Sequence, residues 1–261
     1  MKISVGTLLM PRLSGLAVAM LIVASATAAS AQSVLADDAR QNSPQRFAFE
    51  LRFGPYLPQV DDSVPAGTTA CGNGRPYNAI FGNRSGLMTE LEFDWQALNI
   101  YVGTLAIGGS IGVFHQTAKA FNEGTCTRSE DETGLWLLPI TAMVVLRFDI
   151  LANRWSIPLV PYFKAGITYS IWVATDANGI ATANDGSAGS GGTFGTRLGG
   201  GLMLRLDWIE PQTARTFDNE FGVNHSYLFF EYYWAWVDNF GSGHRMNVGD
   251  ATWVAGLALE F

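Results

Sequence analysis

The sequence predicts an all-β fold, an eight-stranded antiparallel transmembrane β-barrel, with ten strands as the alternative. Three observations predict it. Apolar and polar side chains alternate in eight successive segments, long connections alternate with short ones, and an export signal comes first. The chain has 261 residues, of which 15% are charged, well below the quarter that is usual in soluble domains. Its net charge of −7 argues against nucleic acid as a partner, because phosphate binding needs a basic face.

The amino terminus has the pattern of a cleaved signal peptide over residues 1–31. Lys2 and Arg12 precede an apolar run at 16–24, and Ala29-Ser30-Ala31 matches a cleavage site. A transmembrane anchor is the alternative, but the run is shorter than the ~20 residues that span a bilayer. We expect 32–44 to be a flexible periplasmic lead-in and 45–261 to be the barrel.

Eight segments alternate with a period of two residues, which is the pattern of a strand with one apolar face. The clearest is 135–150, where every second residue from Trp136 to Ile150 is apolar. Several segments match the ~9–11 residues of a tilted membrane-spanning strand. The predicted strands are 46–53, 87–95, 99–115, 135–150, 159–173, 195–208, 226–237 and 252–261.

The connections indicate which strand ends share a side of the membrane. Gaps 54–86, 116–134, 174–194 and 238–251 are long, whereas 96–98 and 151–158 are short. Long loops outside and short turns inside are typical of outer-membrane barrels. The gap 209–225 is an exception, and Pro211 and Gly222 could bound a short periplasmic helix at 211–221. The first long gap could also hide a hairpin, which would give ten strands.

The charged side chains fall on the less apolar faces, which we therefore expect to line the barrel interior. An Arg or Lys facing lipid at mid-bilayer costs ~2–4 kcal/mol, whereas charges inside a narrow barrel can pair. A soluble lipocalin-like barrel is the alternative, with its apolar face turned inward. The predicted interior charges are Arg46, Glu50, Arg52, Glu90, Glu92, Asp94, Arg147, Asp149, Lys164, Arg197, Arg205, Asp207, Glu231 and Glu260.

The carboxyl terminus favours the membrane barrel over the soluble one. Trp253, Ala255, Leu257, Leu259 and Phe261 alternate up to the last residue, like the terminal strand signal of outer-membrane proteins. Aromatic residues also lie near strand ends, where a membrane girdle would be. These are Trp95, Trp136, Phe148, Trp208, Trp234 and Trp236.

The second half of the chain resembles an uncharacterised family of outer-membrane β-barrel proteins of myxobacteria and relatives. The resemblance implies the barrel fold and no particular activity. It is carried by Pro139, Arg147-Phe148-Asp149, Pro161-Tyr162, Lys164-Ala165-Gly166, Trp172, Gly222, His225, Glu231 and Phe261.

The two cysteines fall in the first two long loops, on the same side of the predicted membrane. Because exported proteins meet an oxidising compartment, we expect a Cys71–Cys126 disulfide, with two free thiols as the alternative.

Candidate chemistry is sparse. Glu90, Glu92 and Asp94 share one strand face and could form an acid/base pair or a cation site. An interior salt-bridge network with Arg46 and Arg52 is the expectation we favour, and Glu231 is expected to pair with Arg205. His225 and Ser226 are adjacent, so on a strand they face opposite ways. We therefore expect no catalytic residues, no metal site and no cofactor.

These features predict a structural or surface-interaction protein of the outer membrane, without a large pore, that acts through its extracellular loops. A narrow conduit or binding site for a small apolar molecule is the second hypothesis, because the third and sixth strands are rich in glycine. An outer-leaflet lipid-modifying enzyme is the third hypothesis. The expected partners are outer-membrane lipid and the barrel-assembly machinery, and the extracellular ligand is not specified by the sequence.

Overall fold

The computed structural model describes residues 46–64, 67, 71, 74–122, 125–182, 186–207, 222–242 and 246–261. The predicted signal peptide, the lead-in, Trp208 and the predicted helix at 211–221 lie outside these residues. No helix among those that are described is long and apolar enough to cross a bilayer.

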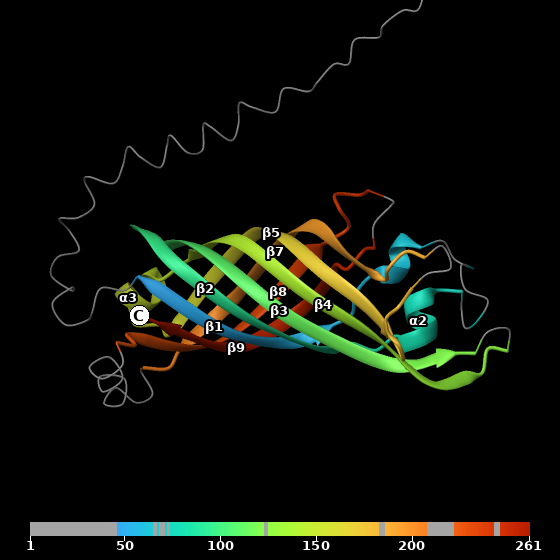
Figure 1. Ribbon diagram of the computed structural model, residues 1–261. Coiled ribbons are helices and arrows are strands. Elements are labelled where there is room, and N and C mark those ends of the chain that lie inside the picture. The colour runs from blue at the N-terminus through green and yellow to red at the C-terminus, as the bar shows by residue number, and fades with distance from the viewer. Residues whose placement is uncertain are drawn as a thin grey trace, which may run out of the picture. The chain divides into compact units, whose positions relative to one another are not determined.

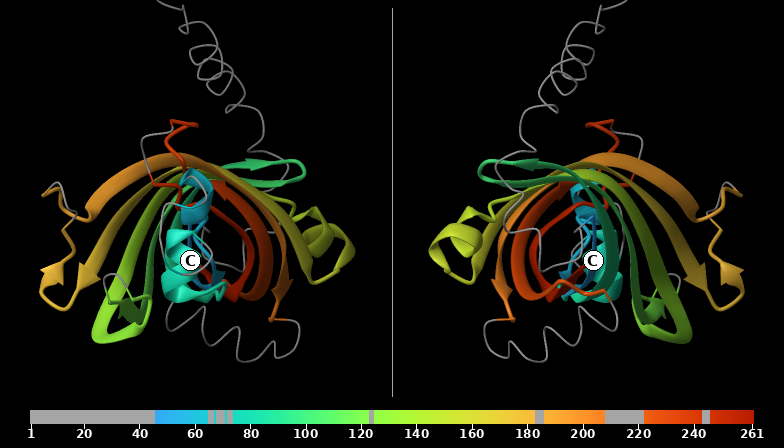
Figure 2. Two further views of the ribbon diagram at one scale, coloured as in Figure 1. Left: turned by 90° about the vertical axis from the view of Figure 1, so that its right-hand side faces the viewer. Right: turned by 90° about the vertical axis from the view of Figure 1, so that its left-hand side faces the viewer.

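Eight antiparallel strands form a closed barrel (Figures 1 and 2). Their order is β4-β3-β2-β1-β9-β8-β7-β5, and pairing of β4 with β5 closes the ring. The two-residue strand β6 only extends β5. The strands are β1 (Phe47–Tyr56), β2 (Gly86–Ile100), β3 (Gly103–Phe121), β4 (Arg128–Arg147), β5 (Leu159–Asp176), β6 (Gly179–Ile180), β7 (Ser190–Arg205), β8 (His225–Trp236) and β9 (Asp250–Glu260).

Among the described residues, three short helices lie at the barrel ends. The 3₁₀ helix η1 (Val60–Ser63) and the helix α2 (Pro76–Phe81) belong to the loop between β1 and β2. We call their end of the barrel the cap end. The helix α3 (Ile150–Trp155) lies at the other end, the terminal end, where β1 begins and the chain finishes (Figure 1). The described residues of the first loop thus form helices rather than the extra hairpin that ten barrel strands would need.

Alternation of burial along each strand puts apolar side chains outside and charges inside. Every second residue of β1 is buried, including Ala48, Glu50 and Arg52, whereas Phe47, Phe49 and Phe53 are exposed. The predicted girdle residues Trp95, Trp136, Trp234 and Trp236 are exposed, and Phe148 is half-buried. The terminal residues Trp253, Leu257 and Phe261 are also exposed on the outer face.

Three predicted segment boundaries are wrong. Residues 96–98 were expected to be a turn, but they belong to β2, and the turn lies at Tyr101 and Val102. A register shift between Gln96 and Leu98 interrupts the alternation there, so the end of β2 looked like the start of the next strand. At the end of β4, Ile150 continues the apolar period of the strand but belongs to α3.

The third error concerns the second long loop. Most of 116–134 is strand, because β3 reaches Phe121 and β4 begins at Arg128. These parts of β3 and β4 form a hairpin that projects beyond the barrel rim at the cap end (Figure 1). This hairpin does not enclose the barrel interior, so its strands lack the alternation of apolar and charged faces that marks the rest.

Candidate functional site

The barrel interior contains most of the charges that the sequence places there. Glu50, Glu90, Glu92, Asp94, Arg147, Asp149, Lys164, Arg197, Glu231 and Glu260 are buried together with Arg52. Arg46 is different, because it precedes β1 and is exposed. Arg205 and Asp207 are only half-buried at the terminal end, and Asp207 follows the last residue of β7.

Arg52 is the centre of the interior network. Its guanidinium donates hydrogen bonds to Glu92 and Glu231, and it lies 3.6 Å from Glu90 and 3.7 Å from Glu50. These carboxylates come from β1, β2 and β8, so one side chain links three strands. The expected pairing of the acidic face of β2 with Arg52 is therefore present, whereas Arg46 takes no part in it.

Arg147 and Lys164 extend the network toward the terminal end. Arg147 donates to Glu260 at 2.6 Å, to Glu50 at 3.3 Å and to Asp94 at 3.4 Å. Lys164 donates to Glu50 at 2.7 Å and also to Glu92. Charge-assisted hydrogen bonds of this kind offset the cost of taking ions out of water.

Arg197 binds Glu90 with both terminal nitrogens, at 2.7 and 3.0 Å, and lies 3.8 Å from the centre of the Tyr233 ring. Glu231 contacts Arg52, Lys164 and Arg197, and not Arg205 as the sequence analysis expected. Arg205 instead donates to Asn153 of α3 and to the Tyr227 hydroxyl.

Two glycines allow these long side chains to fit. A Cβ at Gly199 would lie 2.8 Å from the carboxylate of Glu231, and one at Gly108 would collide with the carboxylate of Asp94. Glycine in the wall of a narrow barrel thus makes room for a charge from the neighbouring strand.

Glu50, Glu92 and Asp94 bring carboxylate oxygens within 4.8 Å of one another, the spacing that a metal ion would require. Each of the three already accepts a hydrogen bond from Arg52, Arg147 or Lys164. These carboxylates are therefore already bound by cationic side chains of the protein, and the three acids form part of the ion-pair network.

The barrel interior also contains a small cavity. A cavity of about 20 Å³, lined by Glu90, Arg197, Thr168 and Ser170 among others, lies between the network and the cap end. The Ser170 hydroxyl is buried and has no hydrogen-bond partner among the described residues. A space of this size fits one or two water molecules, which could bond to Ser170.

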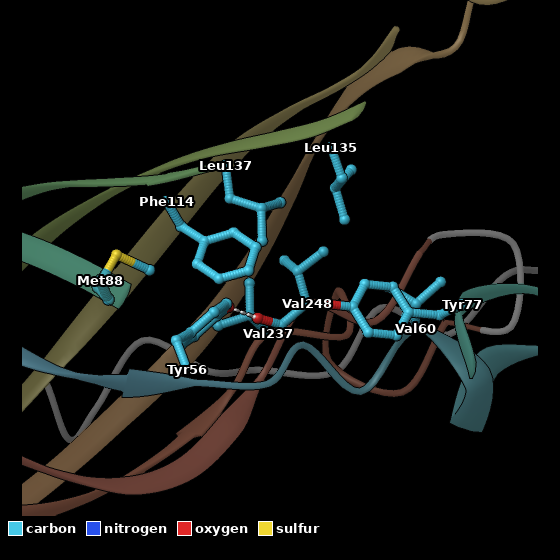
Figure 3. Close-up of a cluster of buried hydrophobic side chains, with 9 residues drawn as sticks. All are labelled: Tyr56, Val60, Tyr77, Met88, Phe114, Leu135, Leu137, Val237 and Val248. Carbon is cyan, nitrogen blue, oxygen red and sulfur yellow. Dashed lines mark hydrogen bonds between the residues drawn. The ribbon is translucent and has the colours of Figure 1, made fainter. Parts of the chain in front are cut away.

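The cap end is filled by an apolar cluster. Figure 3 shows Tyr56 and Met88 next to Phe114 and Leu137 from the barrel wall, with Val60 of η1 and Tyr77 of α2 beyond them. The Tyr56 hydroxyl donates to the carbonyl oxygen of Val248, which ties the fourth long loop into the same cluster. We call the part of the chain from Leu57 to Ser85 the cap.

The cap has its own polar framework. The Asp61 carboxylate accepts hydrogen bonds from the backbone N–H groups of Tyr77 at 2.7 Å and Asn78 at 2.9 Å, and so binds the first turn of α2. The Tyr77 hydroxyl donates to Gln116 of β3 at 2.6 Å. Burial, together with the charge of Asp61, raises the pKa of Tyr77.

A disulfide and an arginine attach the cap to the projecting hairpin. Cys71 and Cys126 are bonded, as the sequence predicts. Arg128 donates to the carbonyl oxygens of Ala79 and Ile80 at the end of α2, and to that of Lys119 across the hairpin. This role of Arg128 is not predictable from the sequence, because nothing in the period of its segment marks it as part of a strand.

His225 and Ser226, the histidine and serine that a lipid-modifying enzyme would need, lie at the terminal end beside Asp207. His225 Nδ1 is hydrogen-bonded to Asp207, and the Ser226 hydroxyl lies 3.4 Å from the same carboxylate. The serine therefore contacts the acid rather than the imidazole, which is not the arrangement of a nucleophile and its base. Burial alone would raise the pKa of Asp207, but the hydrogen bonds from His225 and Ser226 outweigh it and lower the pKa.

No protein-family model and no curated protein matches the chain. Solved structures of outer-membrane proteins are similar to it at low identity. Ail of Yersinia pestis, crystallised with the heparin analogue sucrose octasulfate, is 12% identical, with 83% of this chain and 97% of that chain covered and a TM-score of 0.40. OprG of Pseudomonas aeruginosa is 12% identical, with 85% and 98% covered and a TM-score of 0.47. The N-terminal β-barrel domain of OprF from the same organism is 9% identical, with 84% and 100% covered and a TM-score of 0.38.

Proposed function

We propose that the chain is an integral outer-membrane β-barrel with a structural or surface-interaction role and without a large pore. One observation carries the proposal: a closed barrel presents apolar side chains all around its outside and keeps its ion pairs inside. In water, that arrangement would expose an apolar surface far larger than soluble monomers tolerate. In a bilayer, it satisfies both the lipid and the charges.

The proposed orientation places the cap end outside the cell and the terminal end in the periplasm. The projecting hairpin supports this, because Glu130, Asp131 and Glu132 are all exposed near its tip. The pairing of β4 with β5 begins at Gly134. Among the described residues, the edge of Arg128–Thr133 that faces away from β3 therefore has no partner strand. The proposed interaction surface is therefore an acidic hairpin with an open edge, held in place by the cap.

The absence of a large pore is supported by the contents of the lumen. The ion-pair network, the small cavity and the apolar cluster follow one another along the barrel interior. We propose no catalytic role, because Ser226 contacts Asp207 rather than His225. We also propose that the chain is exported with a cleaved signal peptide and inserted by the barrel-assembly machinery.

Cysteine labelling of whole cells tests the location and orientation. Because the native cysteines are bonded to each other, Glu130→Cys and Ser156→Cys each add one thiol that a membrane-impermeant maleimide can report. We expect the Glu130→Cys protein to react in intact cells and the Ser156→Cys protein only after permeabilisation. Equal labelling at both sites in intact cells would contradict the orientation.

Planar-bilayer recordings test the sealed lumen. The refolded protein should show no steady large conductance at high voltage. A stable open channel would show that the packed interior described above does not represent the protein in a membrane.

A further inference from the structure

A groove of about 870 Å³ runs along the outer wall of the barrel over β3, β4, β5, β7 and β8. Two small residues, Gly200 of β7 and Ala165 of β5, lie between larger side chains in its lining. Phe163, Leu198, Leu202 and Trp234 are among the side chains around them. Of the three glycines at 199–201, Gly200 therefore faces this outer groove, whereas Gly199 leaves room for Glu231 inside the barrel.

The strand register shows how the groove runs. Leu146, Phe163, Gly200 and Tyr232 are successive partners across β4, β5, β7 and β8. Leu146 is next to the last residue of β4, whereas Tyr232 lies in the middle of β8. Because the strands are tilted, the groove rises from the terminal end, beside α3, toward the middle of the apolar outer face of the barrel.

The terminal end of the barrel, which the groove approaches at Leu105 and Leu146, carries exposed aromatic side chains and an arginine. Tyr101 is 75% exposed and Trp155 is 63% exposed. Arg154 donates to the Tyr101 hydroxyl at 2.7 Å, and its guanidinium lies 4.3 Å from the centre of that ring. Figure 2 shows α3 beside the barrel wall rather than across its opening. Tryptophan and tyrosine suit the headgroup region of a membrane, and a guanidinium suits phosphate.

We propose that this groove and the exposed side chains around Arg154 at the terminal end bind one diacyl phospholipid, with an acyl chain over Gly200 and Ala165 and the phosphate at Arg154. The proposal rests on the membrane location proposed above. Two features favour this occupant: the groove is continuous with the apolar outer face, and Arg154 is the exposed charged residue of α3. A lipid at this end belongs to the periplasmic leaflet, so the phospholipid is chosen over the lipopolysaccharide of the outer leaflet.

Native mass spectrometry of the refolded full chain tests the groove, with palmitoyl-oleoyl phosphatidylglycerol as the probe. Ala165→Leu fills the groove, and Ala142→Leu makes the same change on an outward position of β4 outside it. We expect one lipid retained by the wild type and by Ala142→Leu, and about tenfold less retention by Ala165→Leu. Equal retention by Ala165→Leu and the wild type, or an equal loss in both variants, would overturn the site.

Arg154→Gln tests the phosphate. It should lower retention of phosphatidylglycerol about fivefold or more, and it should leave retention of dioleoylglycerol, which lacks phosphate, unchanged. If the wild type retains the same amount of dioleoylglycerol as of phosphatidylglycerol, the phosphate contributes nothing and the assigned phospholipid is wrong. The assignment is also wrong if the wild type prefers lipid A. Failure of the membrane location would look different, because the protein would then not float with phosphatidylglycerol vesicles at all.

Discussion

Arg52 shows at the scale of one residue what a buried ion does in this barrel. It is 0% exposed and contacts carboxylates from three strands. Replacing it with methionine would leave these carboxylates without their shared cation. We expect Arg52→Met to lower the free energy of unfolding by about 3–5 kcal/mol, measured by urea unfolding of the protein in lipid vesicles.

Arg46 is the matched control, because it is the same residue type next to the same strand but is exposed. Arg46→Met should change the free energy of unfolding by less than about 0.5 kcal/mol. Similar losses in the two variants would show that burial in the network does not set the effect.

Asp207 predicts a pH dependence at the terminal end. Its pKa is lowered in the folded protein by His225 and Ser226, against the effect of burial, so its ionised form favours folding. That contribution is complete above the unfolded pKa of about 3.9 and is lost as the pH falls through the lower folded value. Asp207→Asn should therefore cost about 1 kcal/mol at pH 7, and the difference from the wild type should vanish in strong acid.

Unfolding curves at a series of pH values measure this difference. Asp131→Asn is the control for the change of an aspartate to asparagine, because Asp131 is exposed on the projecting hairpin. A difference between Asp207→Asn and the wild type that grows as the pH falls would contradict the assigned sign.

At the scale of elements, the cap is held by long-range ties as well as by its own packing. The Cys71–Cys126 bond spans 55 residues, and closing a loop of that length is worth roughly 4 kcal/mol. Cys71→Ser with Cys126→Ser should let the cap open more often and expose the buried Tyr77 to chymotrypsin. We expect cleavage after Tyr77 to be about 10²- to 10³-fold faster.

The barrel supplies the internal control for that experiment. Tyr227 and Tyr233 are buried in the barrel wall and should remain uncut in both proteins. Cleavage at these sites, or loss of the folded band on an unheated gel, would mean that the disulfide supports the barrel rather than the cap.

The elements also show what could be predicted from the sequence. The barrel strands were predictable because an apolar outer face and a charged inner face impose a strict period of two. The bulge between Gln96 and Leu98 broke that period, and Ile150 continued it by coincidence into a helix. The cap and the hydrogen bonds that Arg128 of the projecting hairpin donates to it were not predictable. They depend on contacts between segments about 50 residues apart.

At the scale of the whole molecule, everything depends on which face of the barrel meets lipid. The sequence placed charges inside because they alternate with apolar residues. It could not distinguish Arg46 from Arg52, because only the start of β1 decides which of them enters the barrel. The partners of the buried charges required the closed ring, since Glu231 of β8 meets Arg52 of β1 across the lumen.

Placing an arginine on the outer face tests this orientation directly. Leu257 lies in β9 and is 49% exposed, whereas Phe240 lies in the fourth long loop at the cap end and is 68% exposed. If the apolar outer face of the barrel meets hydrocarbon, Leu257→Arg should lower the free energy of unfolding in vesicles by about 2–4 kcal/mol, because its charge would lie within the bilayer. Phe240→Arg should have little effect, because that loop lies outside the bilayer. Equal, small effects of the two substitutions would mean that water surrounds both positions, and a soluble barrel would then be the correct description.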